Sequence, residues 1–265
     1  MKICYWSIAW GQYSYILQSL VKSYKDIGLN TEDFHVFSDQ NLKFCVNHGL
    51  DPKIELDKLQ FFKFFYLKNQ VQKLDYDVFV FIDADHFFVR KPEINIKEIL
   101  SDGSSWHSFL ESPINSNKTQ RPDWWGIKNA DLVKYFSDLG VSDTEIRNTN
   151  GGFWICKKHF INEAFDLAFK CHDYLKLKDH IVPEEVSIGY ISHLTNIPKQ
   201  RYAEKYFEYW ASDWTGNFNN IIPINKSWEW VSYMTMEKFI INPAIVHGMR
   251  SKNALIEYGK NILTN

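Results

Sequence analysis

The sequence lacks a clear excess of charge, a long apolar run and any paired cysteine spacing. Lysine and arginine total 30 against 32 aspartates and glutamates, and the formal net charge is −2. Proteins that bind nucleic acid present a basic surface to the phosphates. The composition therefore argues against a nucleic-acid partner.

No stretch approaches the roughly 18 apolar residues that a membrane-spanning helix needs. The N-terminal segment MKICYWSIAWGQYSYILQ has a short apolar stretch that Ser7, Gly11 and Gln12 interrupt. It is too short and too polar for a signal sequence. We therefore expect no transmembrane segment, so that any membrane contact would be peripheral.

The few cysteines have neither CxxC nor zinc-finger spacing. Four thiols in 265 residues are typical of a reduced protein with buried cysteines, which predicts a cytoplasmic location. They are Cys4, Cys45, Cys156 and Cys171.

Aromatic residues, in contrast, make up 17% of the chain. They supply ample material for a core, and the excess of tryptophan and tyrosine also suits a sugar-stacking site. Most of these rings are expected to be structural. A core explains Trp124 and Trp125 least, because they follow the polar stretch of LESPINSNKTQRPDWWG (110–126). These two could form a stacking wall for an acceptor sugar.

The first 85 residues alternate between strand and helix patterns. Apolar residues at helical spacing end at Gly28, a typical C-cap. The predicted order is strand, helix, strand, helix, strand over Lys2–Ala9, Tyr13–Ile27, Phe34–Phe37, Leu56–Leu74 and Val78–Ile82. This order is typical of an α/β protein with a parallel, doubly wound sheet, in which ligands bind outside the carboxyl ends of the strands.

The second half is less regular. We expect a polar loop over 110–126, helices over 130–139, 159–177 and 183–194, and a glycine turn leading into a short strand within NTNGGFWICKK (148–158). A late strand and a basic loop follow in FIINPAIVHGMRSK (239–252), after a tryptophan-rich tract at 202–233 with little periodicity. Neither an internal repeat nor a low-complexity linker is evident, so residues 1–265 are expected to form one domain.

Two carboxylates follow an apolar strand in DYDVFVFIDADHFFVRKP (75–92). Val78–Ile82 predicts a strand buried on both faces, and an unpaired carboxylate in a core is costly. Asp83 and Asp85 are therefore expected at the strand's end. Carboxylates at this spacing can share Mg²⁺ or Mn²⁺ and leave coordination positions for phosphate. A solvated turn with capping aspartates is the alternative interpretation.

This D-x-D segment resembles that of the GT-A glycosyltransferases, particularly the retaining families typified by glycogenin and the bacterial lipopolysaccharide galactosyltransferases. Three further stretches match in the expected order, namely SIAWGQYSYILQSLVKSYKDIG (7–28), NTNGGFWICKK and IVHGMRSK (245–252). The resemblance implies a single-domain GT-A (Rossmann-like) fold with a mostly parallel central sheet flanked by helices. Residues 1–100 would form a nucleotide-binding half and residues 101–265 an acceptor-binding half.

Two positions depart from the glycogenin pattern. The residues after His247-Gly248 are Met249-Arg250-Ser251-Lys252 rather than Lys-Pro-Trp. Glu184-Glu185 stands where an Asp-Gln pair is usual, which is similar to the blood-group-transferase-like family with its glutamate near the reacting anomeric carbon.

The resemblance also implies a metal site and a donor-sugar segment. Asp85 and His247 would hold Mn²⁺ or Mg²⁺, and Asp83 would contact the metal or the ribose. A buried histidine bonded to a carbonyl group is the alternative for His247. The segment at the donor sugar would be Asn150, Gly151 and Gly152, where glycine permits close approach, although a hairpin turn without ligand would use the same residues.

Charged residues are the candidates for catalysis. Arg250 and Lys252 would stabilise a departing diphosphate. Glu185, and to a lesser degree Glu184, would serve the reaction. Acidic residues in a first helical turn are also favoured by the helix dipole alone.

The ends of the first two strands supply further candidates for donor binding. Ser7, Ala9 and Tyr13 could read the base through backbone groups or by stacking, with core packing the alternative for Tyr13. Asp39 could contact base or ribose, or belong to a surface turn. Lys63 could reach the donor, or lie on a solvated helix edge.

Taken together with these patterns, the resemblance implies a metal-dependent hexosyltransferase. It would move a sugar from a nucleotide-diphosphate sugar, with UDP favoured, to a hydroxyl of a glycan or protein acceptor, with retention of configuration. The alternatives are a non-catalytic, metal-dependent sugar-binding module and a D-x-D phosphatase. The phosphatase motif would lie near the chain start and continue with Thr or Val, whereas His86-Phe87 follow here.

Overall fold

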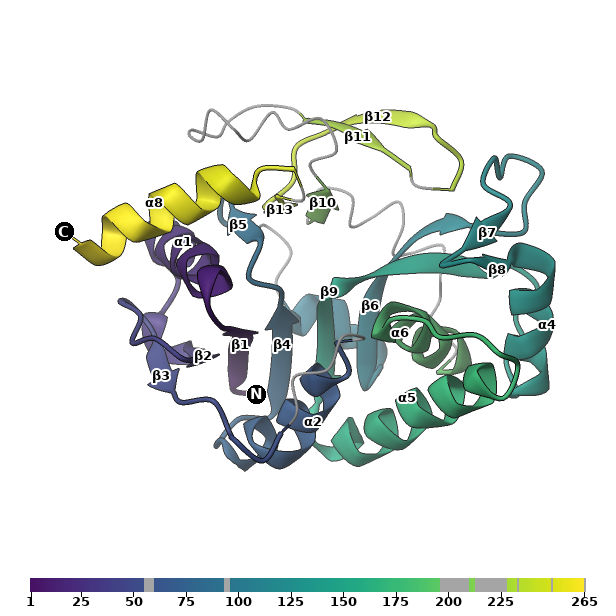
Figure 1. The fold of residues 1–265 in the computed structure, drawn as a ribbon, viewed down its shortest axis with the longest axis horizontal. Coiled ribbons are helices and arrows are strands. Elements are labelled where there is room, and N and C mark those ends of the chain that lie inside the picture. Colours follow the sequence, from purple (N-terminus) through teal and green to yellow (C-terminus); the bar gives the residue numbers. More distant parts are fainter. Residues whose placement is uncertain are drawn as a thin grey trace.

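A six-stranded sheet forms the centre of the computed structural model, which describes residues 1–54, 60–92, 96–195, 210–212, 228–232, 234–248 and 250–264 (Figure 1). The strand order is β3-β2-β1-β4-β9-β6. The first four strands in sequence are mutually parallel, and β9 runs antiparallel to both of its neighbours. The strands are β1 (Ile3–Ala9), β2 (Phe34–Ser38), β3 (Val46–His48), β4 (Val78–Ile82), β6 (Trp106–Pro113) and β9 (Arg147–Lys157). The predicted α/β class with a mostly parallel central sheet is confirmed.

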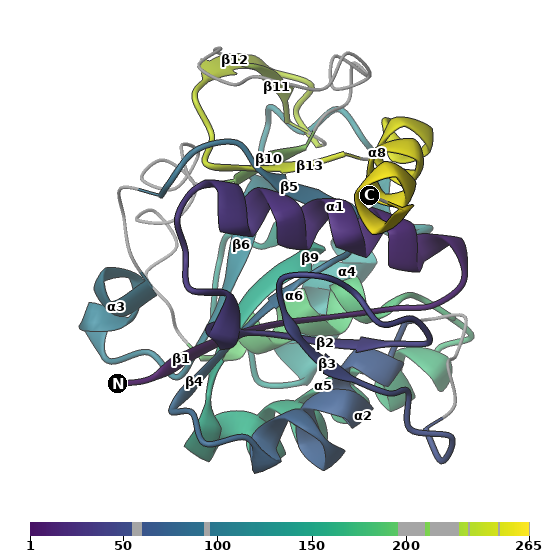
Figure 2. The same ribbon diagram turned by 90° about the vertical axis from the view of Figure 1, so that its left-hand side faces the viewer.

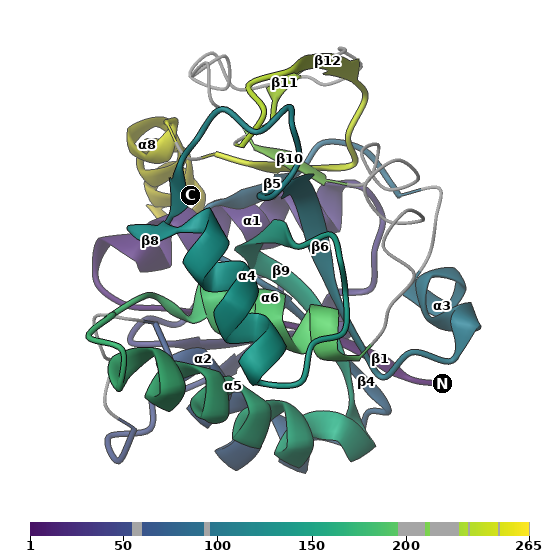
Figure 3. The same ribbon diagram turned by 90° about the vertical axis from the view of Figure 1, so that its right-hand side faces the viewer.

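Helices cover both faces of this sheet (Figures 2 and 3). One face carries α1 (Gln12–Asp26) and α8 (Lys252–Thr264), which pack against each other. The other carries α2 (Phe62–Asn69), α5 (Ile161–Lys176) and α6 (Glu184–Leu194), and α6 contacts both β6 and β9. Every residue of β2 and β4 is buried as a result, which explains their nearly continuous apolar runs.

Shorter elements complete the described chain. A three-stranded sheet has the order β10-β13-β5, and its antiparallel pair β13–β5 places His247 opposite His86. The remaining elements are β5 (His86–Phe88), β7 (Asp123–Trp124), β8 (Ile127–Lys128), β10 (Trp210–Ser212), β11 (Trp228–Val231), β12 (Lys238–Ile241), β13 (Ile245–His247), α3 (Ile96–Ile99), α4 (Asn129–Asp138), and the 3₁₀ turns Thr31–Asp33, Val71–Lys73, Leu100–Asp102 and Lys158–Phe160.

The chain reverses its direction of winding next to β1. β1 lies between β2, the next strand in sequence, and β4. Such a switch point opens a crevice at the carboxyl ends of the two diverging strands, where α/β proteins bind ligands. Here those ends are Ala9 on β1 and Ile82 on β4, so Asp83 and Asp85 lie beside the crevice.

Several predicted boundaries were wrong. β3 was not predicted, and helix α2 begins only at Phe62, with 55–59 outside the described residues. β6 continues to Pro113, into a segment predicted as loop, because it pairs with β9 as far as Arg147. The paired glycines lie inside β9 rather than in a turn before it. Trp214 and most of the tract 202–233 lie outside the described residues.

The two halves of the sequence share one hydrophobic core. A single cluster of buried apolar side chains runs from Cys4 on β1 to Leu255 on α8. Cys4, Cys156 and Cys171 are buried as expected, and Cys45 is half-buried. Among the helices described, none has the length and apolar character that crossing a bilayer would demand.

Helices α1 and α8 meet at Gly259, almost backbone to backbone. A Cβ atom at Gly259 would lie 1.8 Å from the carbonyl oxygen of Tyr15. The Ser19 hydroxyl donates a 2.6 Å hydrogen bond to the carbonyl of Leu255 beside it. This contact seats α8, whose first residue is Lys252, against the rest of the fold.

Replacing Gly259 by alanine should therefore destabilise the protein, although alanine is the better helix former by about 1 kcal/mol. We expect a loss of at least about 2 kcal/mol in the free energy of unfolding, because the backbone of α1 cannot move aside cheaply. Gly49 is a matched control, because a Cβ there meets nothing within 4 Å. Urea denaturation measures both variants, and equal stability of Gly259→Ala and wild type would contradict the close packing.

Candidate active site

Two adjoining cavities open at the carboxyl ends of β1 and β4. The first, of about 290 Å³, is lined by Ile8, Ala9, Trp10, Tyr13, Phe62 and Lys63, and we name it the aromatic cavity. The second, of about 370 Å³, is lined by Glu111, Trp125, Asn150, Gly151, Glu184 and Glu185, among others, and we name it the acidic cavity. Gln60, Asp83, Asp85 and Lys252 line both. These four residues are therefore the junction of the cavities.

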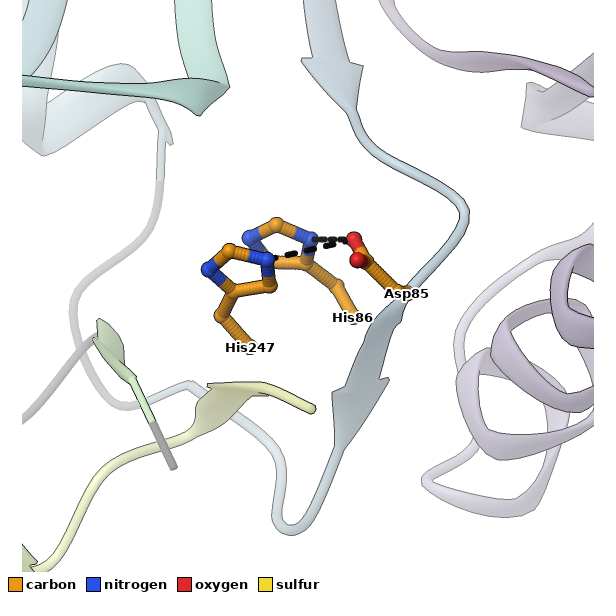
Figure 4. A group of neighbouring side chains, drawn as sticks. All are labelled: Asp85, His86 and His247. Atoms are coloured by element: carbon orange, nitrogen blue, oxygen red, sulfur yellow. Dashed lines mark ion pairs between the residues drawn. The ribbon is translucent and has the colours of Figure 1, made fainter. Parts of the chain in front are cut away.

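Asp85, His86 and His247 form a buried cluster at this junction (Figure 4). His247 Nε2 lies 3.3 Å, and His86 Nδ1 3.7 Å, from Asp85 Oδ1. The two imidazole rings stack with centroids 4.6 Å apart and planes 3° from parallel. Within the described part of the chain, this group is the one whose ligand atoms all lie within 4.8 Å of one another, as a metal site requires.

Hydrogen bonding fixes the form of His86. Its Nδ1 lies 3.1 Å from the carbonyl oxygen of Asp83, which can only accept, so Nδ1 carries the proton and Nε2 the lone pair. Burial, with a contribution from His247, lowers the pKa of His86, which favours the neutral ring that binds metals.

Neighbouring side chains keep Asp85 ionised. Burial alone would favour its protonated form, but His247, His86 and Lys252 hold the pKa of Asp85 well below its ordinary value. Lys252 Nζ lies 3.0 Å from Asp85 Oδ2 and 3.3 Å from the hydroxyl of Tyr13. The ammonium group of Lys252 thus bridges the aromatic cavity and the cluster.

Lys63 is buried between two carboxylates. Its ammonium group lies 2.7 Å from Glu184 Oε1 and 3.1 Å from Asp83, and the residue is only 2% exposed. The alternative of a solvated helix edge was therefore wrong. Although burial opposes the charge, Asp83 and Glu184 raise the pKa of Lys63, so the ammonium form is retained. Asp83 consequently faces Lys63 rather than the Asp85 cluster.

Glu185 lies in the acidic cavity with both oxygens held. Oε1 accepts a hydrogen bond from the backbone N–H of Gly151 (3.1 Å), and Oε2 accepts one from Trp125 Nε1 (2.6 Å). Burial, together with Glu184 and Glu111, raises the pKa of Glu185 to about 8. Burial likewise raises the pKa of Glu184 and of Glu111 to about 7.

The paired glycines are required by close approach rather than by backbone conformation. A Cβ atom at Gly152 would lie 2.5 Å from the ring of His86, and one at Gly151 would lie 2.9 Å from Glu184 Oε1. Asn150 Oδ1 accepts a hydrogen bond from the Gly152 N–H at 2.7 Å. The hairpin-turn alternative for this segment was therefore wrong.

The structure brings most of the predicted site residues to the cavities. These are Ala9, Tyr13, Lys63, Asp83, Asp85, Asn150, Gly151, Gly152, Glu184, Glu185, His247 and Lys252. Tyr13 is 47% exposed, which rules out the core-packing alternative.

Three predicted residues are not among those that line either cavity. The Ser7 side chain is fully buried, because Ser7 lies within β1 and pairs with Val36. Asp39 accepts hydrogen bonds from the Gly11 N–H (2.8 Å) and the Ser14 hydroxyl (2.6 Å), so it fixes the start of α1. Arg250 is exposed on the surface.

The two adjacent tryptophans also differ. Trp124 is only 2% exposed and packs in the core, so the expectation that a core explains it poorly was wrong, although it also lines the acidic cavity. Trp125 is 51% exposed, as that expectation requires.

Sequence reasoning missed His86, Glu111, Gln60 and Trp10. His86 directly follows the D-x-D motif, and Glu111 is a lone carboxylate after the apolar stretch Phe109-Leu110. Both signals were present in the sequence. Nothing in the sequence, however, indicates that β6 pairs with β9 next to β4, or that β13 pairs with β5.

No family model matches the chain, and no curated protein matches it.

Replacing Lys63 by methionine should destabilise the fold strongly. The change leaves Asp83 and Glu184 facing each other without their cation, and breaking a buried ion pair costs about 3–5 kcal/mol. Because Glu184 can take up a proton when its pKa rises further, we expect the loss to be smaller at about pH 5 than at about pH 8. Chemical denaturation at the two pH values measures this.

Lys68 on the same helix provides the matched control. Its ion pair with Asp166 is longer (3.8 Å) and more exposed, so Lys68→Met should change the stability by less than about 1 kcal/mol. The double variant Lys63→Met/Glu184→Gln should regain part of the loss. Equal losses of stability in Lys63→Met and Lys68→Met would contradict a buried ion pair between Lys63 and the carboxylates of Asp83 and Glu184.

A second prediction concerns Glu185 and pH. Since its pKa is raised in the folded state, folding favours the protonated form, and stability is lost as the pH rises from about 4.5 towards about 8. Glu185→Gln is permanently neutral, so it should be more stable than wild type at about pH 9, by at least about 1 kcal/mol, and similar at about pH 5. The control is Glu163→Gln on α5, because Glu163 is exposed and so lacks the burial that acts on Glu185. A pH-independent difference between Glu185→Gln and wild type would refute the raised pKa.

Proposed function

We propose that this protein is a metal-dependent glycosyltransferase that moves a sugar from a nucleotide-diphosphate sugar to an acceptor hydroxyl. The observation that carries the proposal is that two chemically different cavities meet at one pair of carboxylates. A nucleotide sugar would lie across the junction, with its base in the aromatic cavity and its sugar in the acidic cavity. The mostly parallel sheet, with its carboxylates at the end of β4, agrees with the resemblance to GT-A enzymes.

The aromatic cavity has the chemistry of a nucleotide site. Trp10 is 37% and Tyr13 47% exposed, so both can stack on a planar base. Trp10 is braced by an edge-on contact with Phe62. The ammonium group of Lys252 lies at the junction, where it can bind a diphosphate oxygen.

The junction fits a divalent metal. Asp85 and His247 supply one carboxylate and one imidazole. His86 would add a second imidazole only by giving up the hydrogen bond from its Nδ1, the nitrogen that faces Asp85, to the carbonyl oxygen of Asp83. Such a donor set suits Mn²⁺ better than Mg²⁺, which prefers oxygen ligands. Asp83 would join this set only by exchanging its contact with Lys63. Such a metal would neutralise the charge that develops on a departing diphosphate.

The acidic cavity suits the reacting sugar. Loss of the diphosphate leaves positive charge on the sugar ring. This charge would favour the ionised forms of Glu184 and Glu185, and their carboxylates would in turn stabilise it. Lys63 holds Glu184 in one orientation, while Gly151 and Trp125 hold Glu185. Either residue would act on one face of the sugar, as a retaining transfer requires.

The first test is metal-dependent nucleotide binding. Calorimetric titration of UDP should show affinity that rises with Mn²⁺, and Asp85→Asn should lose this response while keeping the fold. Hydrolysis of nucleotide sugars should fall by at least about a hundredfold, the scale of a lost electrostatic group. Asp131 on α4 is a suitable control, because Asp131→Asn changes an exposed carboxylate that lines neither cavity.

Other outcomes would point elsewhere. A full Mn²⁺ response in Asp85→Asn would remove the metal centre from the proposal. Binding of free sugars with no affinity for UDP, GDP or CDP, with or without Mn²⁺, would favour a sugar-binding module. Release of phosphate from p-nitrophenyl phosphate would favour a phosphatase.

A further inference from the structure

A tryptophan occupies an unfavourable position in the hairpin formed by β7 and β8. The connecting turn has two residues, Trp125 and Gly126, with φ of 53° and 77°. Hairpin turns with positive φ at both positions favour Asn-Gly or Asp-Gly. A bulky residue in the left-handed region is strained, and such strain is found mainly at functional sites. The geometry of the turn therefore does not explain why this position is a tryptophan.

The rest of the hairpin is built to hold this residue over the acidic cavity. Trp124 is buried, and its ring packs so closely on α6 that a Cβ atom at Gly189 would lie 3.0 Å from it. Asp123 accepts a hydrogen bond from the Gly126 N–H at 3.2 Å and closes the turn. The neighbouring Trp125 is half-exposed and lines the acidic cavity.

We infer that Trp125 is the platform of an acceptor subsite for carbohydrate, which names the acceptor class of the proposed function and rests on that proposal. A pyranose has an apolar face of C–H groups and a rim of hydroxyls. The indole of Trp125 matches the apolar face, as amphipathic aromatic rings do at binding sites. The carboxyl groups of Glu185 and Glu111 match the hydroxyls, because a carboxyl group can form hydrogen bonds with O–H groups in its ionised and in its protonated form.

The polar lining of the acidic cavity suits the hydroxyl rim of a sugar. Glu111 and Glu185 offer carboxyl oxygens, and Asn148 and Asn150 offer side-chain amides. A sugar hydroxyl both donates and accepts hydrogen bonds, so it can pair with either kind of group.

The Trp125 indole also positions Glu185. Because Trp125 Nε1 donates to Glu185 Oε2 at 2.6 Å, stacking of a sugar on the ring and orientation of the carboxylate are linked. Trp125→Phe keeps a ring but removes the donor. Trp125→Asn removes the ring and suits the left-handed turn.

The experiment is ¹⁹F NMR of the whole chain labelled with 5-fluorotryptophan. Spectra of Trp125→Phe and Trp10→Phe assign one signal to each cavity. Methyl β-galactopyranoside, methyl β-glucopyranoside, methyl α-mannopyranoside, lactose, cellobiose and maltose are then titrated, with glycerol as the control. We expect at least one sugar to shift the Trp125 signal saturably at millimolar concentration, without glycerol doing so. UDP with Mn²⁺ should shift the Trp10 signal instead.

The two signals separate the two hypotheses. If no sugar moves the Trp125 signal while UDP with Mn²⁺ moves that of Trp10, the carbohydrate subsite is overturned and the proposed function stands. If sugars shift the Trp125 signal but UDP with Mn²⁺ does not shift the Trp10 signal, the carbohydrate subsite stands and the transferase proposal fails. An unfolded, alkylated protein is added in a separate titration as a polypeptide ligand. If it shifts the Trp125 signal and none of the sugars does, carbohydrate is overturned as the acceptor class.

Thermal unfolding distinguishes a binding role from a structural one. Trp125→Asn relieves the strained turn, so its melting temperature should stay within about 2 °C of wild type or rise. In the same variant, the ¹⁹F signals of the other tryptophans should no longer change when the sugar is added. A fall of more than about 6 °C would show that Trp125 is retained for stability, and would overturn the inference.

Discussion

A single buried ammonium group joins the parts of this protein that form its cavities. Lys63 of α2 contacts Asp83, at the end of β4, and Glu184, at the start of α6. A charge removed from water must be paired, so none of these three elements can shift without exposing or orphaning a charge. The positions of the other charged groups depend on this constraint, since Asp85 lies two residues after Asp83 and Glu185 directly follows Glu184.

Close backbone approach is the second requirement of the site. Gly151 and Gly152 leave room for Glu184 and His86, and Gly259 lets α8 lie against α1 so that its first residue, Lys252, reaches Asp85. Each glycine lies in an ordinary helix or strand, where it costs conformational entropy. That cost is offset because side chains from distant segments converge at the crevice beside β1 and β4. The result is a region rich in buried charge and narrow contacts, which is typical of binding sites rather than of structural cores.

Local patterns in the sequence were enough to predict much of the fold and the centre of the site. The unbroken apolar run of β4 reflects a strand that is buried on both faces. The apolar residues of α1 recur at helical spacing because one face of that helix is buried. These two patterns predicted the α/β class. Asp83 and Asp85 follow such a run, which placed them at a strand end. Boundaries failed where pairing with a distant strand decides the outcome. β6 continues through Pro113 because β9 lies beside it, and short apolar patterns contain no information about that partner.

The sequence by itself determined which residues carry charge next to apolar strands and where glycine interrupts them. Only the tertiary structure decided which charges meet. Asp83 pairs with Lys63 and not with the Asp85 cluster, and His86 joins that cluster because β13 brings His247 alongside β5. Trp124 and Trp125 are adjacent, chemically identical and both line the acidic cavity, yet Trp124 is 2% exposed and belongs to the core, whereas Trp125 is 51% exposed. The physical reason is that pairing and burial depend on distances across the fold, which a linear pattern does not contain.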